Sequence, residues 1–466
     1  MLELIIIAVY FAGMIAVGLV SRRKAKGADE FFVAGRKGSS LLITGSLLAT
    51  IVGGSATVGM AGLGFTRGLT GAWWLLVGSI GLVVLGFFFA KKVRKFALYT
   101  LPELVKEQYD GRVALAASLL IVVSWVGIVA GQIVAAGKIM SVVGIGDPLL
   151  WMVLFAVVFV VYTVLGGQHA IIRTDTLQTV IIFAGIFGGL ALLLSRLGGF
   201  SGLKSSLSPE QFAFPVGPQF GGYELIALLL LVGLTYVVGP DMYSRLFCAK
   251  DGGTARASVL WTALLIIPVA LGITVIGMGA SVLFPEIASE QAFPTVIKEV
   301  LPPFLGGVVL AALLCAVMSS ADTCLLSAST ILTMDVIKRF KPSLNEGRIL
   351  SLSRWGIVVL GLLSLILALV VKGVISALLF AYTVYTAGLV LPVIAGFYRS
   401  RLKVTPLGAL VAIVGGGSAA LVSRFLDIKY LDVGALLIGA FLLFVVSFIS
   451  RRMKGRTALD SAQGMN

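Results

Sequence analysis

Oxygen-bearing side chains gather in one strongly apolar stretch of the chain, AVMSSADT, from Ala316 to Thr323. Residues three or four positions apart share a face of a helix. One such face carries small or hydroxyl side chains, with Asp322 at its edge: Ala316, Ser319, Ser320 and Thr323. Hard cations prefer oxygen ligands, and a divalent structural site needs more carboxylates than this. The pattern therefore favours a weakly held monovalent cation, although each hydroxyl could instead bond its own i−4 carbonyl.

Asp175 is the second acidic residue that lies beside an apolar run, in the segment GGQHAIIRTD. A charged side chain near the bilayer centre costs roughly 2.5–3.5 kcal/mol, so it usually faces a cavity or a partner. Asp175 could bind an ion, or it could cap a helix or pair with Arg173. His169 is the only histidine. We expect it in a solvated inner loop, which gives no support to histidine-based catalysis.

The amino-acid composition predicts whether the helices that carry these residues lie in water or in a lipid bilayer. Of the 466 residues, 59% are hydrophobic and 12% charged, and the mean hydropathy is +1.07. Soluble domains are about half apolar and about a quarter charged. The apolar runs are long and do not alternate, which predicts membrane-spanning helices in contact with the lipid bilayer. The net charge of +15 lies in short loops, so it indicates membrane orientation and no nucleic-acid partner.

We expect thirteen spans, at about residues 3–20, 39–65, 71–90, 113–142, 148–165, 172–197, 221–239, 257–284, 304–337, 354–371, 375–398, 405–424 and 432–450. Basic residues concentrate in alternate loops, near 22–26, 91–95, 338–341, 399–403 and 451–456, and in one that holds Arg245, Lys250 and Arg256. The positive-inside pattern predicts a cell-membrane protein with its N-terminus outside and its C-terminus in the cytoplasm.

Two glycine clusters differ from the rest of the 56 glycines. One is Gly53-Gly54, and the other runs from Gly233 to Gly239-Pro240. Gly53 and Thr235 stand at matching depths, 14 residues after repeat starts at 39 and 221. Paired interruptions of this kind indicate inverted repeats with broken helices around a midplane site. Close helix packing through small residues is the alternative explanation.

Three stretches resemble the sodium:solute symporter family: DEFFVAGR at 29–36, YTVLGG at 162–167 with Thr174, Asp175 and Gln178, and AVMSSAD at 316–322. The resemblance covers nearly the whole chain in the same order. It implies an all-α polytopic membrane protein with about 13 transmembrane helices and two inverted five-helix repeats, the LeuT-like core. The implied divisions are 1–38 (first transmembrane helix and cytoplasmic loop), 39–220 and 221–400 (the two repeats), and 401–466 (two C-terminal helices and a cytoplasmic tail).

The resemblance also implies a Na⁺ site between the first and eighth core helices. Its ligands correspond to the backbone carbonyls of Ala49, Val52 and Ala316 and the hydroxyls of Ser319 and Ser320. Some members hold a second Na⁺, and the matching residues here are Asp175, Ser319 and Thr323. Asp322 stands where those members often carry serine. A second ion near Asp175, Asp322 and Thr323 therefore stays open.

The expected substrate pocket lies beside the two breaks and is lined by Gly54, Ser55, Ala56, Gln132, Thr235 and Tyr236. Positions that bind sugar in sugar-transporting relatives are small or apolar here, such as Ala56 and Val232. The Ser-Ser-Ala-Asp run is also similar to choline-type members, but no aromatic cage is evident. The resemblance thus implies a sodium-coupled secondary active symporter that imports a small organic solute by alternating access and functions as a monomer. An amino acid such as proline, or a small carboxylate, is favoured over sugar.

Two alternatives remain open from the sequence. A proton-coupled carrier on the same fold would use Asp175 or Asp322 as its proton site. A membrane-embedded enzyme, such as a lipid-modifying transferase, would need ionisable catalytic groups clustered at one interface. The chain offers one histidine and few buried carboxylates, which speaks against an enzyme.

Overall fold

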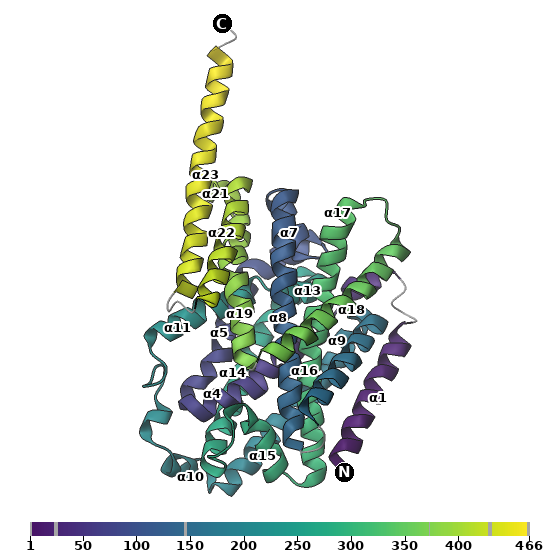
Figure 1. The fold of residues 1–466 in the computed structure, drawn as a ribbon, viewed down its shortest axis with the longest axis vertical. Coiled ribbons are helices and arrows are strands. Elements are labelled where there is room, and N and C mark those ends of the chain that lie inside the picture. Colours follow the sequence, from purple (N-terminus) through teal and green to yellow (C-terminus); the bar gives the residue numbers. More distant parts are fainter. Residues whose placement is uncertain (1, 23–26, 144–146, 372, 427–430, 464–466) are drawn as a thin grey trace.

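The computed structural model describes residues 2–22, 27–143, 147–371, 373–426 and 431–463. Within these ranges the chain forms helices joined by short loops, and the start of α1 and the end of α23 lie at opposite ends of the molecule (Figure 1). The first half contains α1 (Leu2–Arg22), α2 (Ala28–Val33), α3 (Ser40–Ile51), α4 (Met60–Arg67), α5 (Trp73–Val84), α6 (Ala90–Phe96), α7 (Leu101–Gln108), α8 (Gly111–Val143), α9 (Pro148–Arg196) and α10 (Gly199–Ser206).

The second half is also helical. It contains α11 (Gly222–Leu228), α12 (Leu234–Val237), α13 (Pro240–Cys248), α14 (Gly252–Leu283), α15 (Ala292–Val300), α16 (Pro303–Ile331), α17 (Lys338–Phe340), α18 (Glu346–Val370), α19 (Val374–Tyr385), α20 (Leu391–Gly396), α21 (Arg399–Leu402), α22 (Pro406–Phe425) and α23 (Leu431–Gln463). Short 3-10 or π turns join several of them, including Ser55–Gly59 before α4 and Leu229–Gly233 before α12.

Ten helical stretches in the described residues are long and apolar enough to cross a membrane. Two of them combine spans that the sequence separates. Ser55–Phe96 contains both α4 and α5, and α9 continues from 148 to 196 across a kink at Gly167, where φ is 54°. Apolar helices at Ile5–Val17 and Ser40–Ile51 are shorter. The fold is all-helical and polytopic, as predicted, and the described residues give ten spanning stretches where thirteen were expected.

Two helices break where the glycine clusters lie. Helix α3 ends at Ile51, Val52 leaves helical geometry with φ −82° and ψ 55°, and the helix resumes at Ser55. Likewise α12 ends at Val237, and α13 begins at Pro240 after an extended Gly239 with ψ 130°. Proline suits the first turn of a helix because it lacks the N–H that would be unpaired there. Each break leaves backbone carbonyls without a helical partner.

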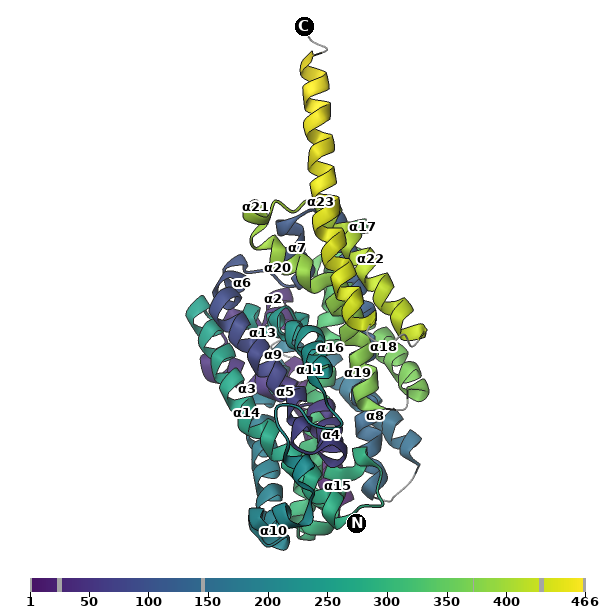
Figure 2. The same cartoon turned by 90° about the vertical axis from the view of Figure 1, so that its left-hand side faces the viewer.

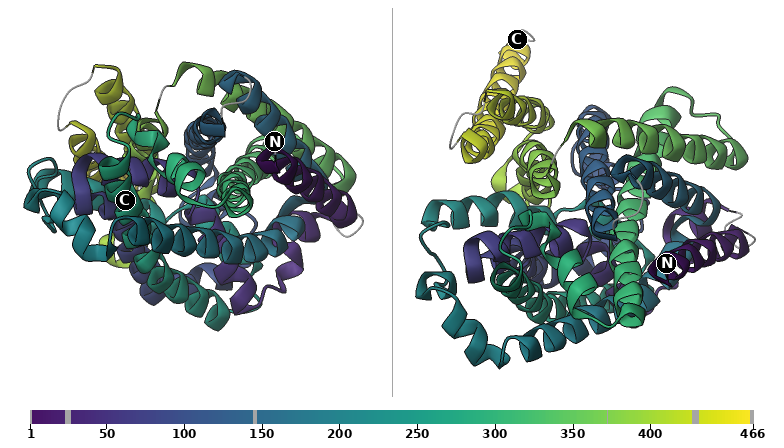
Figure 3. Two further views of the ribbon diagram at one scale, coloured as in Figure 1. Left: turned by 90° about the horizontal axis from the view of Figure 1, so that it is seen from below. Right: turned by 60° about the horizontal axis from the view of Figure 1, so that its bottom comes forward.

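Helix α16 lies at the centre of the arrangement and positions the polar face. It packs against α8, α9, α1 and α3, and all its residues from Val309 to Ile331 are buried. Helices α22 and α23 pack against each other at one side of the bundle, as the side and end views show (Figures 2 and 3). The oxygen-bearing face of α16 therefore meets protein, not lipid.

Candidate cation and solute site

The broken end of α3 meets α16 through a direct hydrogen bond. The Ser320 hydroxyl donates to the Thr50 carbonyl at 2.5 Å and to the Ala316 carbonyl at 3.2 Å. Ala49, Val52 and Ala316 are buried, with at most 1% of their surface exposed. Because α3 ends at Ile51, the Leu48 carbonyl accepts the last backbone N–H, from Val52 at 2.8 Å, and the carbonyls after it have no helical N–H partners. The five residues expected to bind Na⁺ thus lie on two packed elements beside a broken helix.

Glycine at this break is required by the close approach of α16. A Cβ added to Gly53 would lie 2.0 Å from the Ser320 hydroxyl oxygen. At Gly54 it would lie 2.4 Å from the Ala135 Cβ, and the Gly54 N–H donates to Gln132 Oε1 at 2.8 Å. The two glycines therefore let the chain turn within contact distance of α16 and α8.

Ser319 connects α16 with α9. Its hydroxyl donates to Asp175 Oδ1 at 2.5 Å, and Ser46 donates to the other oxygen of the same carboxylate at 2.5 Å. Asp175 is fully buried, and its ion pair is not with Arg173, which is exposed. Ser319, one of the expected Na⁺ ligands, is consequently also bonded to the Asp175 carboxylate.

The ion-pair partner of Asp175 is Arg245, and its location corrects the sequence interpretation. Arg245 was expected in an inner loop with Lys250 and Arg256. It is instead 0% exposed and lies on α13, directly after the second break. Its Nη2 lies 3.3 Å from Asp175 Oδ2. Counting basic residues places arginines in loops, but an arginine with a buried counter-ion can lie inside the protein.

The Arg245 guanidinium uses all three of its nitrogens. Nε donates to the Ser46 hydroxyl at 3.1 Å, and Nη1 donates to the Ser244 hydroxyl at 3.2 Å. Nη2 donates to Thr50 at 2.9 Å and also to Thr323. Asp175 and Thr323 are two of the residues expected around a second Na⁺. A cation that belongs to the protein therefore lies among those oxygens.

Asp322 and His169 have surroundings that the sequence did not predict. Asp322 is 1% exposed, the Thr323 hydroxyl donates to its Oδ1 at 3.4 Å, and no ion pair among the described residues joins it to Arg245. His169 was expected in a solvated loop. Its side chain is only 13% exposed and its Nδ1 lies 3.4 Å from Glu30 Oε2, just after the kink in α9.

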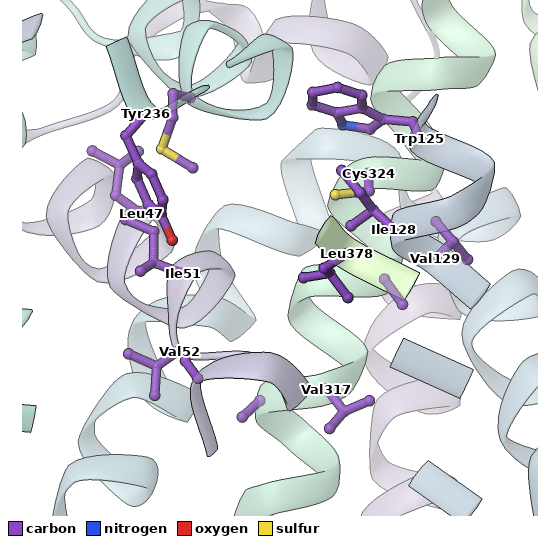
Figure 4. Close-up of a cluster of buried hydrophobic side chains, with 14 of the residues drawn as sticks. Leu47, Ile51, Val52, Trp125, Ile128, Val129, Tyr236, Val317, Cys324 and Leu378 are labelled. Carbon is purple, nitrogen blue, oxygen red and sulfur yellow. The ribbon is translucent and has the colours of Figure 1, made fainter. Parts of the chain in front are cut away.

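A small cavity of about 30 Å³ lies between the two breaks. It is lined by Thr50, Ile51, Ser55, Ile128, Gln132, Thr235, Tyr236, Asp241, Met242, Ser320, Cys324, Leu378 and Tyr382. Figure 4 shows the apolar part of this region, with Tyr236 across from Cys324 and Leu378 and with Ile51 at the end of α3. This volume is far below the roughly 300–1,000 Å³ of ligand pockets, so an organic solute can enter only if the walls move.

Four of the six expected pocket residues line this cavity: Ser55, Gln132, Thr235 and Tyr236. Gly54 and Ala56 are fully buried and do not line it. The sequence interpretation missed Asp241 and Tyr382. Asp241 stands directly after the Gly239-Pro240 break, a signal that could have identified it. Tyr382 lies in an ordinary apolar run and carries no such signal.

Comparison with known proteins identifies this arrangement. The model of the sodium:solute symporter family matches residues 31–416. The chain belongs to the sodium:solute symporter family. It is 26% identical to a sodium/glucose cotransporter of Vibrio parahaemolyticus, over 92% of this chain and 86% of that protein. It is also 26% identical to a sodium/pantothenate symporter of Haemophilus influenzae, over 91% of this chain and 90% of that one.

The structure of a Na⁺-coupled sialic acid symporter superposes with a TM-score of 0.82 at 19% identity, covering 97% of this chain and 98% of that one. Mhp1, a nucleobase-cation-symport-1 family transporter, gives a TM-score of 0.63 at 15% identity, over 92% of this chain and 95% of its own. These neighbours show that the symporter has the LeuT-like fold. It is a sodium-coupled transporter and not an enzyme, as the sequence predicted.

Proposed function

We propose that this symporter couples one Na⁺ to the import of one small organic solute by alternating access. The Na⁺ would lie between α3 and α16. Its ligands would be the carbonyls of Ala49, Val52 and Ala316 and the hydroxyls of Ser319 and Ser320. The observation that carries this placement is the hydrogen bond from Ser320 to the Thr50 carbonyl at 2.5 Å. That bond brings a hydroxyl of α16 to the backbone oxygens freed at the end of α3.

Arg245 supports a single Na⁺ per cycle. Its guanidinium is always charged and presents several donors to oxygen acceptors. It contacts Asp175 and Thr323, the oxygens that a second Na⁺ would need. Two unit charges 4 Å apart repel by about 4 kcal/mol at an effective dielectric constant of about 20. A second Na⁺ beside Arg245 would therefore be displaced, and Asp322 alone offers too few ligands to hold one.

The walls of the cavity favour an amino acid or a small carboxylate over a sugar. Ile51, Ile128 and Leu378 form an apolar side of an otherwise largely polar lining, which suits a solute with an apolar body and one polar or charged end, whereas a sugar presents hydroxyls on all sides. The Thr235 hydroxyl already donates to the Leu231 carbonyl at 2.8 Å, while Gln132 accepts from Gly54. The named relatives act on glucose and pantothenate. Because each of these relatives is only 26% identical to this chain, we infer the solute class from the residues that line the cavity and not from the relatives' solutes.

The direction of transport follows from the expected orientation in the cell membrane, with the N-terminus outside and the C-terminus in the cytoplasm. Basic residues from loops far apart in sequence, including Lys92, Arg399 and Arg451, line one surface depression near the end of the bundle from which α23 extends (Figure 1). Such clustering supports a cytoplasmic face under the positive-inside rule. We propose that 39–220 and 221–400 form the inverted repeats and that a single chain is sufficient for transport.

The test is uptake of labelled solutes into proteoliposomes with Na⁺ and H⁺ gradients imposed separately. The expected result is uptake that requires an inward Na⁺ gradient and is lost when K⁺ replaces Na⁺ outside. Undiminished uptake driven by a pH gradient alone would contradict the sodium assignment and favour a proton-coupled carrier.

A further inference from the structure

Asp241 is an acidic side chain in the wall of the solute cavity that the sodium site does not use. It is the second residue of α13 and lines the cavity with Tyr236 and Tyr382. Every other residue of α13 is buried, whereas Asp241 is partly accessible. Because the rest of the helix is enclosed, the accessible face of Asp241 is the one directed into the cavity.

Within the part of the chain that the structure describes, no ion pair includes this carboxylate, although the Arg245 charge lies near enough to act on it. Arg245 stands four residues later on the same helix, the spacing at which a helical salt bridge forms. Arg245 instead extends to Asp175 at 3.3 Å, and its remaining donors are taken by hydroxyls. Among the ion pairs of the described residues, none includes Asp241. Its carboxylate lies against the backbone amides of Asp241 and Met242, at the first turn of α13.

The surroundings of Asp241 suit a positively charged nitrogen. Buried charges require a counter-charge, since an isolated ion in a protein interior is strongly disfavoured. Tyrosine rings attract cations through their π faces, and both Tyr236 and Tyr382 line the same cavity. Met242, Cys324 and Leu378 complete an apolar wall. A solute with an ammonium group on a small apolar body could pair its charge with the carboxylate, place that charge against the tyrosine rings and pack its apolar part against this wall.

We propose that Asp241 binds the cationic nitrogen of the solute, so that this symporter selects amine-bearing solutes, such as amino acids or quaternary ammonium compounds. This inference rests on the proposed function. It narrows that proposal by excluding solutes that carry only a carboxylate or only hydroxyl groups.

The experiment uses the full chain in proteoliposomes and compares solutes of matched shape with and without a cationic nitrogen. The pairs are L-proline with cyclopentanecarboxylate, L-leucine with 4-methylpentanoate, and choline with 3,3-dimethylbutanol, beside D-glucose and pantothenate. The readout is Na⁺-dependent uptake of each labelled solute, because a carboxylate anion that moves with one Na⁺ carries no net charge and gives no current. We expect uptake of the amine-bearing members only, and a KM raised about 10- to 100-fold by Asp241→Asn, because charge-assisted hydrogen bonds are the stronger class.

Asp251→Asn is the matched control. Asp251 is the exposed N-cap of α14, and asparagine caps a helix as well as aspartate does, so its KM should not change. Folding is checked by ²²Na⁺ binding to the purified Asp241→Asn variant, which should be retained because the hydroxyls of Ser319 and Ser320 bond to Asp175, Thr50 and Ala316 and not to Asp241. A panel in which no amine is taken up contradicts the inference, as does uptake of the matched nitrogen-free solutes or an unchanged KM in Asp241→Asn. Loss of ²²Na⁺ binding to wild type would instead refute the proposed function.

Discussion

Replacing Arg245 with leucine should lower the free energy of unfolding by about 3–5 kcal/mol, because removing one partner of a buried ion pair leaves the other charge uncompensated. The variant would leave the Asp175 carboxylate with only the hydroxyls of Ser46 and Ser319, each at 2.5 Å. Asp175→Asn would leave the guanidinium without its counter-ion. The double variant leaves neither charge alone, so it should recover much of the loss.

The assay is a double-mutant cycle of reversible unfolding in mixed micelles, with Na⁺ activation of uptake measured beside it. We expect a coupling energy above about 1.5 kcal/mol between the two positions. In Arg245→Leu the space beside Asp175 and Thr323 is free for a cation, so the Hill coefficient for Na⁺ should rise above one. Additivity of the two single variants within about 0.5 kcal/mol would refute the idea that Arg245 is the resident cation of this site.

Three further predictions follow from single contacts. Ser319→Ala and Ser320→Ala should each raise the Na⁺ concentration for half-maximal uptake; if both hydroxyls only bond their own helix, the Na⁺ dependence measured at normal expression stays unchanged. Gly53→Ala should abolish uptake, since its Cβ would lie 2.0 Å from the Ser320 oxygen, and wild-type uptake rates would disprove that close approach. Asp251 accepts the Thr254 N–H at 2.7 Å, and this bond lowers the pKa of its carboxyl. Its contribution to stability is therefore present above the unfolded pKa of about 3.9 and is lost as the pH falls through the lower folded value. Asp251→Ala should lower the melting temperature at pH 7, and that difference should shrink below about pH 4; a pH-independent difference would exclude the carboxylate cap.

The breaks and the hydroxyl face could be predicted because their signals are local. Gly53-Gly54 and Gly239-Pro240 disfavour a continuous helix wherever they occur, and the structure breaks beside both. Ser319 and Ser320 follow from helical spacing alone. Spacing could not identify the other expected Na⁺ ligands, Ala49 and Val52, which are predicted from the resemblance to the family.

Arg245 could not be placed from the sequence, since its location depends on Asp175, 70 residues away. A basic residue between two apolar runs is usually a loop residue, and only the folded chain brings the carboxylate to it. The residues that line the cavity also could not all be predicted from the sequence, because some reach it only through the packing of distant helices. Tyr382 reaches the cavity through the packing of α19 near both breaks, and nothing in its own segment distinguishes it from other membrane-facing aromatic residues.

The most direct test of the account is the ratio of Na⁺ to solute flux in proteoliposomes at a clamped potential, with ²²Na⁺ and whichever labelled solute the wild type transports. One Na⁺ moving down about 100 mV and a tenfold gradient releases about 3.7 kcal/mol, which supports roughly 500-fold accumulation of a solute without net charge. We predict a ratio of one. A ratio of two that falls to one in Asp175→Asn or Asp322→Ser would contradict the account, because it would place a second Na⁺ where Arg245 lies.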